Sequence, residues 1–177
     1  THLTDYELIC DFNVPIVFEK PISSSLTDTR KVIDNSNCMA GPYVFFQRRL
    51  SPEFQALLTL SRSNALKSPN SILCHLSKYK SKTGFGYLSH YGIHYIDLIF
   101  RLLNVHDYKI FSFLGDSPGF EKVASVSGCF NHNTHFSLLL DCYSRFSCGS
   151  SISIQYDNAS ILIKDHEVSV IADRSLA

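Results

Sequence analysis

The sequence has little charge and no excess of either sign. Charged residues make up only 18% of its 177 residues, and the 16 basic side chains equal the 16 acidic ones in number. A protein with no net charge creates no field that attracts nucleic acid or an anionic membrane, so we expect neither partner. No apolar run approaches the roughly 20 residues of a membrane span, and no signal peptide is recognisable at the start. We therefore expect a cytoplasmic protein.

Cysteine motifs are also missing. None of the six cysteines forms a C-x-x-C pair, which argues against zinc-knuckle and thioredoxin-type sites. Several lie in apolar runs, as Cys74 does, so we expect buried free thiols in a reducing cytosol rather than disulfides. The first residue is Thr1. We interpret it as a cut end rather than a processed nucleophile, because nothing near it supplies a partner base.

Glycine-rich phosphate loops are absent as well. Neither G-x-G-x-x-G nor G-x-x-x-x-G-K-[ST] occurs in the sequence. The pair Gly84-x-Gly86 is followed by Ser89 where a third glycine would be needed. We interpret Gly86 and Gly92 as positions that permit close packing or the close approach of a ligand.

The first third of the chain alternates between helical and strand patterns. Ser25 is placed to cap one helix, and Pro52 suits the first turn of another. The alternation predicts a parallel α/β sheet, and because it begins with a helix, the strand that should precede that helix is missing. The expected elements are a helix over 3–12, a strand over 15–18, a helix after residue 25, a strand over 43–46 and a helix from 52 to about 64.

The pattern changes after residue 70. A strand over 71–79 and one long helix over 84–104 are followed by a series of short strands separated by turn residues. The fold class is therefore α/β (α+β), with an open, mostly antiparallel sheet that carries helices on one face. The expected strands span 108–114, 122–130, 135–143, 151–156, 159–164 and 167–172.

Three groups of residues could carry chemistry. Lys20 follows a strand that is expected to be parallel, where α/β sheets bind ligands, and its ammonium could act as an acid or orient a hydroxyl. It could equally be a surface lysine. Arg48 and Arg49 could clamp a carboxylate or phosphate, or could mark an exposed strand end. The turn over 131–135 contains two histidines, for which a metal role is a minor alternative.

The third group lies on the long helix. His90, His94 and Asp97 are spaced i, i+4, i+7, which places them on one helix face. They could form an acid/base pair oriented by Asp97, or a metal site with two histidines and a carboxylate. They could also be an ordinary face on which Asp97 pairs with Arg101. Position 91 is Tyr, so the H-E-x-x-H motif is absent.

The order of these motifs resembles that of the Gfo/Idh/MocA oxidoreductases. The matching segments are Glu19-Lys20-Pro21, then Gln47-Arg48-Arg49 with Pro52, then Gly84-x-Gly86 leading into a G-x-H-x-x-D stretch over 92–97. The resemblance implies that residues 1–50 are the C-terminal remnant of a Rossmann domain and that 51–177 form a substrate and oligomerisation domain. It also implies NAD or NADP as cofactor and a sugar or polyol as substrate. Without its glycine loop, the fragment itself should be inactive.

The resemblance also assigns roles to residues. Lys20, His94 and His90 would be catalytic, and these three together with Asp97 would bind substrate. Glu19, Lys20, Pro21 and Arg48 would lie on the cofactor side, and no metal is implied. His90 stands where the family has an aspartate, so the proton relay or the substrate should differ. Phe85 and Leu50 depart from the family's second glycine and its usual aromatic residue.

Two other functions remain open from the residues. A metal-dependent hydrolase could use the face that carries His90, His94 and Asp97. A non-catalytic binding or oligomerisation module could be built on the sheet over 108–172, through which we expect a homo-oligomer.

Overall fold

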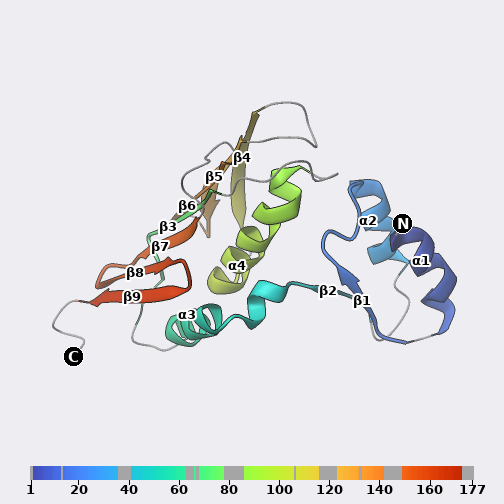
Figure 1. The fold of residues 1–177 in the computed structure, drawn as a ribbon, viewed down its shortest axis with the longest axis horizontal. Coiled ribbons are helices and arrows are strands. Elements are labelled where there is room, and N and C mark those ends of the chain that lie inside the picture. The colour runs from blue at the N-terminus through green and yellow to red at the C-terminus, as the bar shows by residue number, and fades with distance from the viewer. Residues whose placement is uncertain are drawn as a thin grey trace. The chain divides into compact units, whose positions relative to one another are not determined.

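The computed structural model describes residues 2–12, 14–35, 41–62, 66, 68–77, 86–105, 107–115, 123–131, 133–141 and 149–172. The chain divides into two compact units, Thr1–Gln47 and Arg48–Ala177 (Figure 1). The predicted boundary after residue 50 is close to this division, but the roles predicted for the two parts stay predictions.

The first unit is a small α/β arrangement. Its strands pair in parallel, as predicted, with Val17 opposite Tyr43. Its core consists of Tyr6, Ile16, Phe18, Ile22 and Val32. In chain order the elements are α1 (His2–Ile9), a 3₁₀ turn (Cys10–Phe12), β1 (Ile16–Glu19), α2 (Leu26–Asp34) and β2 (Pro42–Phe45).

Local chemistry explains where α2 begins. Ser25 has an extended backbone, and its hydroxyl accepts a hydrogen bond from the backbone N–H of Asp28 at 3.3 Å. Asp28 places a negative charge in the first turn, where the helix dipole favours it. The predicted cap is confirmed.

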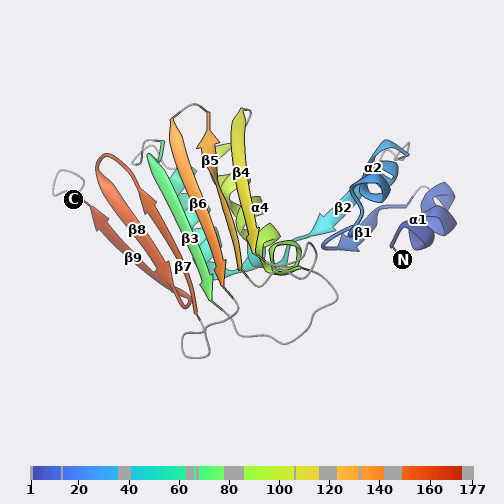
Figure 2. The ribbon, with the colours of Figure 1, turned by 90° about the horizontal axis from the view of Figure 1, so that it is seen from above.

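The second unit packs two helices on a seven-stranded sheet (Figure 2). Helix α3 begins at Pro52, as predicted, directly after a 3₁₀ turn over Gln47–Leu50. The elements after that turn are α3 (Pro52–Arg62), β3 (Ser71–Ser77), a π-helical turn (Leu88–Gly92), α4 (Ile93–Leu103), β4 (Tyr108–Gly115), β5 (Val123–Phe130), β6 (Thr134–Asp141), β7 (Gly149–Gln155), β8 (Ala159–Lys164) and β9 (Glu167–Ala172).

The strand order of this sheet is β4-β5-β6-β3-β7-β8-β9. Strand β3 pairs in parallel with β6 and antiparallel with β7, whereas every other pair is antiparallel. The expected open, mostly antiparallel sheet is confirmed. The strands lie within about two residues of their predicted ranges wherever those ranges are described.

The helices cover one face of the sheet, and the core lies between the two layers (Figure 2). Helix α4 buries His94, Tyr95, Leu98 and Ile99 on this face. Along the strands, buried residues alternate with more exposed ones, as a half-covered sheet requires. No helix in the described ranges is long and apolar enough to cross a membrane.

The long helix differs from the prediction in its winding. A π-helical turn over Leu88–Gly92 precedes the α-helix that starts at Ile93. The backbone N–H of Ile93 reaches the carbonyl of Leu88, five residues earlier, rather than four. Asn104 ends α4 in the left-handed conformation, with φ of 46°. Gly84 and Phe85 lie outside the described residues.

Candidate functional site

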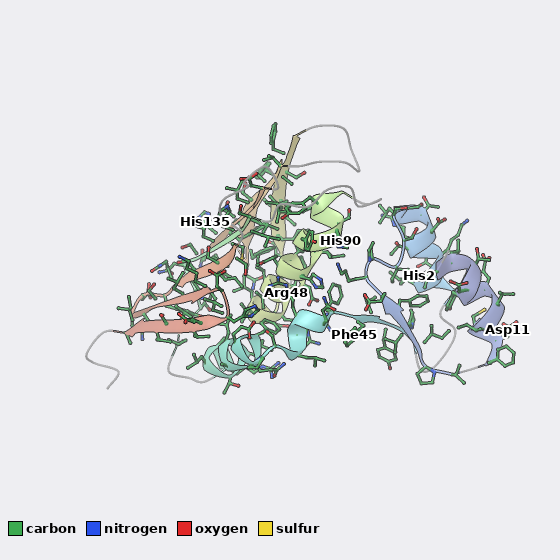
Figure 3. The ribbon with its side chains drawn as sticks, in the orientation of Figure 1. His2, Asp11, Phe45, Arg48, His90 and His135 are labelled. Carbon is green, nitrogen blue, oxygen red and sulfur yellow. The ribbon has the colours of Figure 1, made fainter. Side chains whose placement is uncertain are left out.

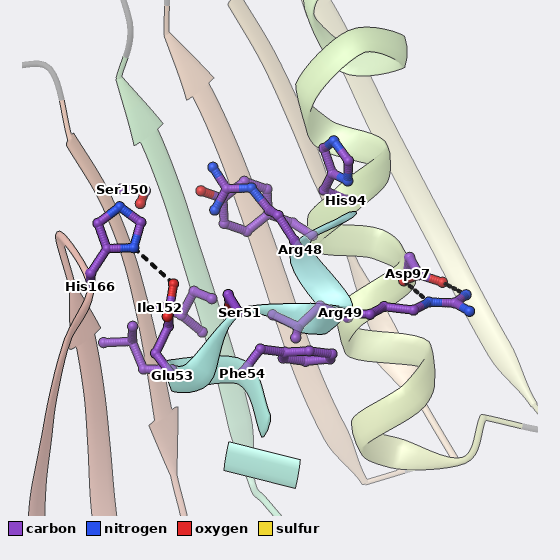
Figure 4. Close-up of a pocket in the computed structure, with 13 residues that line it drawn as sticks. Arg48, Arg49, Ser51, Glu53, Phe54, His94, Asp97, Ser150, Ile152 and His166 are labelled. Atoms are coloured by element: carbon purple, nitrogen blue, oxygen red, sulfur yellow. Dashed lines mark hydrogen bonds and ion pairs between the residues drawn. The ribbon is translucent and has the colours of Figure 1, made fainter. Parts of the chain in front are cut away.

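A small pocket lies within the second unit, between the start of α3, helix α4 and strands β7 and β8 (Figure 4). Its cavity is about 30 Å³, which is room for about one water molecule. A sugar ring cannot enter a space of this size and would have to lie across its opening. The described residues that line it are Arg48, Arg49, Ser51, Glu53, Phe54, His94, Tyr95, Asp97, Leu98, Ser150, Ile152, Ile163 and His166.

Arg49 and Asp97 form a forked ion pair on one side of the pocket (Figure 4). The Nε of Arg49 donates to Oδ2 of Asp97 at 2.7 Å, and a terminal guanidinium nitrogen donates to Oδ1. The pair raises the pKa of Arg49 above its ordinary value, chiefly through the hydrogen bond to Asp97, against the lowering effect of burial. Asp97 therefore pairs with Arg49, and the suggestion that it pairs with Arg101 is wrong.

Arg48 leaves the same turn in a different direction (Figure 4). Its guanidinium carbon lies 5.0 Å from the centre of the Tyr95 ring, a cation–π arrangement. Burial raises the pKa of Tyr95 above its ordinary value, while the positive charge of Arg48 acts to lower it. Tyr95 is only 1% exposed, so its ring is a fixed surface for the guanidinium.

His94 shares the pocket wall with Arg48. It is one of three buried polar or charged residues that the structure describes, with 4% of its surface exposed. Its position in the first turn of α4 fixes the backbone, and its neighbour Tyr95 packs into the core. An imidazole held in this way has a defined orientation, as an acid/base group needs.

Glu53 and His166 close the side of the pocket beside the β8–β9 hairpin (Figure 4). His166 and Asp165 form the turn of this hairpin, both with positive φ. Nδ1 of His166 lies 2.8 Å from Oε1 of Glu53. Burial would raise the pKa of Glu53, but hydrogen bonds from His166, its own backbone and Ser51 outweigh that effect, so the pKa is lowered.

His90 is not among the described residues that line the pocket. It lies in the π-helical turn that precedes α4 (Figure 3). Its ring packs edge-on against that of Tyr91, with 4.5 Å between the ring centroids. The spacing argument assumed α-helical winding throughout, whereas the π turn changes the angle between His90 and the residues after it. The structure thus brings His94 and Asp97 to one pocket, and the part played by His90 stays a prediction.

Lys20 belongs to the first unit. It follows β1 directly, as predicted, and is half-buried, with Glu19 exposed at the last position of the strand. The Lys20–Pro21 peptide bond is cis. The roles of these three residues stay predictions.

The metal interpretation finds no support among the described residues. They contain no group of three or more histidine, cysteine, aspartate or glutamate side chains that could hold a metal ion. The carboxylate of Asp97, one of the three proposed ligands, is occupied by Arg49. A metal-dependent hydrolase is therefore not favoured. His132, in the turn over 131–135, lies outside the described residues.

The sequence interpretation missed several pocket residues. Tyr95 could have been found as the aromatic neighbour of His94. Ser150 and His166 carry no local signal, because strand pairing alone brings them to α3 and α4. Glu53 was not considered because an acidic residue in a first helical turn is usually explained by the helix dipole.

No protein-family model matches the chain, and no curated protein does. Solved structures do match. WlbA dehydrogenase from Bordetella pertussis, in complex with NADH and UDP-GlcNAcA, superposes with a TM-score of 0.85 at 13% identity over 98% of this chain. The chain has the fold of the matched part of this dehydrogenase. The fold expected from the Gfo/Idh/MocA resemblance is thereby confirmed.

Two further structures share this fold. UDP-N-acetylglucosamine 3-dehydrogenase GnnA from Acidithiobacillus ferrooxidans gives a TM-score of 0.82 at 13% identity over 97% of the chain. The myo-inositol dehydrogenase of Lactobacillus casei, in complex with NAD(H) and myo-inositol, gives 0.78 at 14% identity over 92%. The chain spans 60% of the WlbA chain, 57% of GnnA and 51% of the inositol dehydrogenase.

Proposed function

We propose that the chain is the later part of a nicotinamide-dependent oxidoreductase acting on a CH–OH group of a sugar or cyclitol. One observation carries the proposal: nearly the whole chain shares its fold with dehydrogenases that have been solved with NADH or NAD(H). The nicotinamide would accept or supply the hydride. NAD and NADP are both compatible with the 177 residues.

The residues of this chain would manage the proton. When a hydroxyl becomes a carbonyl, its proton must pass to a base as the hydride leaves the carbon. We assign the hydroxyl proton to Lys20 and give His94 the substrate-side acid/base role, with His90 in the position of the family's aspartate. Glu19 and Pro21 would set the turn that aims Lys20 toward the cofactor. Asp97 would act through Arg49, by holding the pocket wall in place.

The proposal requires a nucleotide site beyond these residues. Since no G-x-G-x-x-G occurs in the sequence, nothing in it would cradle a pyrophosphate at a helix N-terminus. We therefore expect the 177-residue chain to be inactive by itself. Reading the source gene upstream of Thr1 tests this directly. An in-frame strand, glycine loop and helix would support the oxidoreductase, and a gene without them would contradict it.

Turnover of the complete gene product tests the residue roles. Lys20→Ala and His94→Ala should each lower turnover by about 10² or more, the usual scale for an acid/base group. Lys31→Ala is the matched control, because Lys31 is an exposed lysine on α2 in the same unit as Lys20. Full activity in both test variants would refute the assignment. His90→Asp should raise turnover if the relay requires a carboxylate.

The open face of the sheet favours a homo-oligomer as a further part of the proposal. One row of mutually paired residues crosses five strands on this face without a charge. Neutral, half-exposed sheet surfaces of this kind suit subunit contacts. The row consists of Ser127, Ser137, Leu73, Ser153 and Leu162. A non-catalytic oligomerisation module would use the same face, and the reading of the upstream gene separates the two functions.

A further inference from the structure

Among the described residues that line the pocket, Arg48 is a cation without a carboxylate partner. Two carboxylates, Glu53 and Asp97, are among the described lining residues. Asp97 accepts hydrogen bonds from Nε and one terminal nitrogen of Arg49, and Glu53 pairs with His166. Among the residues described, no carboxylate lies within ion-pair distance of Arg48. The positive charge of Arg48 is therefore available to a ligand at this pocket.

The guanidinium of Arg48 is held in place before any ligand arrives. It lies over the ring of Tyr95 at 5.0 Å, and that ring is buried in the core of the unit. Both Arg48 and Tyr95 line the pocket, so the stacked guanidinium is held at its edge. A guanidinium fixed over an aromatic face loses little rotational freedom on binding, and its remaining donors keep the forked geometry that suits carboxylate and phosphate oxygens.

We infer that Arg48 binds the carboxylate or phosphate of an anionic sugar, so that the enzyme acts on acidic rather than neutral sugars. The inference rests on the proposed function, in which His94 is the acid/base group on the substrate side. Arg48 and His94 line one pocket, whose cavity admits about one oxygen atom. One oxygen of the anionic group would enter this cavity, and the ring would lie across the opening beside His94.

The position of Arg48 in the pocket also favours a substrate, rather than the cofactor, as the molecule whose anionic group it binds. The resemblance placed Arg48 on the cofactor side together with Glu19, Lys20 and Pro21. The guanidinium lies over the ring of Tyr95 and shares the pocket with His94, the residue proposed for the substrate side, and the cofactor-side role stays a prediction. NADP⁺ is accordingly included as a competing ligand in the test.

Binding to the 177-residue chain tests the inference without any turnover. Amide NMR spectra would be titrated with D-glucuronate, glucose 6-phosphate, glucose and NADP⁺ at matched ionic strength. We expect either or both of the acidic sugars to bind at least about tenfold more tightly than glucose, the usual scale for a charge-assisted hydrogen bond. The relative affinities of the two acidic sugars decide between carboxylate and phosphate.

Arg48→Gln should abolish this preference, and Arg48→Lys should retain only part of it, because a lysine keeps the charge but loses the fork. Arg101→Gln is the matched control, since Arg101 is an exposed arginine on α4 outside the pocket. A preserved preference in Arg48→Gln would overturn the inference. So would equal binding of acidic and neutral sugars by the unaltered chain, or NADP⁺ as the ligand whose binding depends on Arg48.

Turnover by the complete gene product separates this inference from the proposed function. Oxidation of neutral sugars as efficient as that of acidic ones would overturn the inference and leave the oxidoreductase standing. Absence of dinucleotide-dependent turnover, with Arg48-dependent binding of acidic sugars retained, would overturn the oxidoreductase and leave the anion site standing.

Discussion

Arg49 binds the carboxylate of Asp97 through Nε and one terminal nitrogen of its guanidinium, across 48 positions of the sequence. This pair fastens the turn before α3 to the middle of α4 and so fixes two walls of the pocket. The Asp97 side chain is 12% exposed and that of Arg49 is 31% exposed. The pair should therefore contribute more than a surface ion pair and less than a fully buried one.

A double-mutant cycle measures that contribution. Asp97→Asn should destabilise the second unit by about 2 kcal/mol, because it leaves the charge of Arg49 without its counter-ion. The double variant Asp97→Asn/Arg49→Gln should be destabilised by less than the sum of the two single variants, with a coupling energy of about 1 kcal/mol. Urea unfolding followed by circular dichroism provides the values. Strict additivity of the two changes would show that the ion pair contributes nothing.

Gly128 on β5 is the position where the sheet tolerates no side chain. A Cβ there would lie 2.0 Å from the backbone carbonyl oxygen of Lys109 on the neighbouring strand β4. Gly128→Ala should therefore push the β4 and β5 backbones apart and cost about 2–4 kcal/mol. The control is Ser127→Ala, because Ser127 directly precedes Gly128 but faces the open side of the sheet. This variant should change stability by less than about 0.5 kcal/mol. Urea midpoints of the two variants give the comparison.

Cys74 and Cys129 should differ in reactivity. Cys74 is fully buried on the helix-covered face, and burial raises the pKa of its thiol to about 12. Cys129 is partly exposed on β5. Because only the thiolate reacts, iodoacetamide should label Cys129 in the folded protein and Cys74 only after unfolding. Peptide mass mapping after brief alkylation distinguishes them, and early labelling of Cys74 would contradict its burial.

Glu53 and His166 make stability depend on pH. The folded state lowers the pKa of Glu53 below 4.5, so the ionised carboxylate favours folding above that value. This contribution is lost as the pH falls through the lowered pKa. Glu53→Gln should flatten the loss of stability below about pH 5. His166→Asn should make this loss smaller, because without the hydrogen bond from His166 the pKa of Glu53 is lowered less. Urea midpoints over this range test both, and an unchanged profile in Glu53→Gln would be the contrary result.

Charge placed in the centre of the open face should disrupt self-association. Ser153 is the fourth of the five residues in the uncharged row and lies between Leu73 and Leu162. Ser153→Lys would bury an ammonium in any contact made there, at a cost that favours monomers. Light scattering after size exclusion measures the mass. Ala56→Lys, on an exposed position of α3, is the control. An unchanged oligomer mass in Ser153→Lys would show that this face does not form the subunit contact.

The starts of helices could be predicted where residues within one turn determine them. Ser25 and Pro52 begin their helices because a cap hydroxyl and a fixed φ act within one turn. The π turn before Ile93 was not predictable, since no residue there breaks the helical pattern and the extra residue is accommodated only by packing. Gly92 shows this constraint, because a Cβ on it would meet the buried side chain of Leu140 at 2.8 Å.

The sequence indicated several residues of the candidate site, but it did not indicate which of them contact one another. His94 and the two arginines stood out from spacing and type. Which arginine pairs with Asp97 is decided by the turn over Gln47–Leu50, which sends Arg48 and Arg49 in different directions. Ser150 and His166 reach the pocket through strand pairings separated by many residues. Sequence periodicity indicates which face of a strand is buried, but it does not indicate which distant strand is its neighbour.

The pairing of strand β3 with strands that come later in the chain constrains the order in which the sheet of the second unit can assemble. Strands β4 to β6 and strands β7 to β9 are each joined to the next by short connections and can pair as they leave the ribosome. Residues 71–77 emerge before all of them but pair with 135–141 and 149–155. The earliest strand must therefore wait, unpaired, for the later ones before it can join the two halves. Synthesis that stalls before residue 155 would leave an apolar strand edge open to other chains.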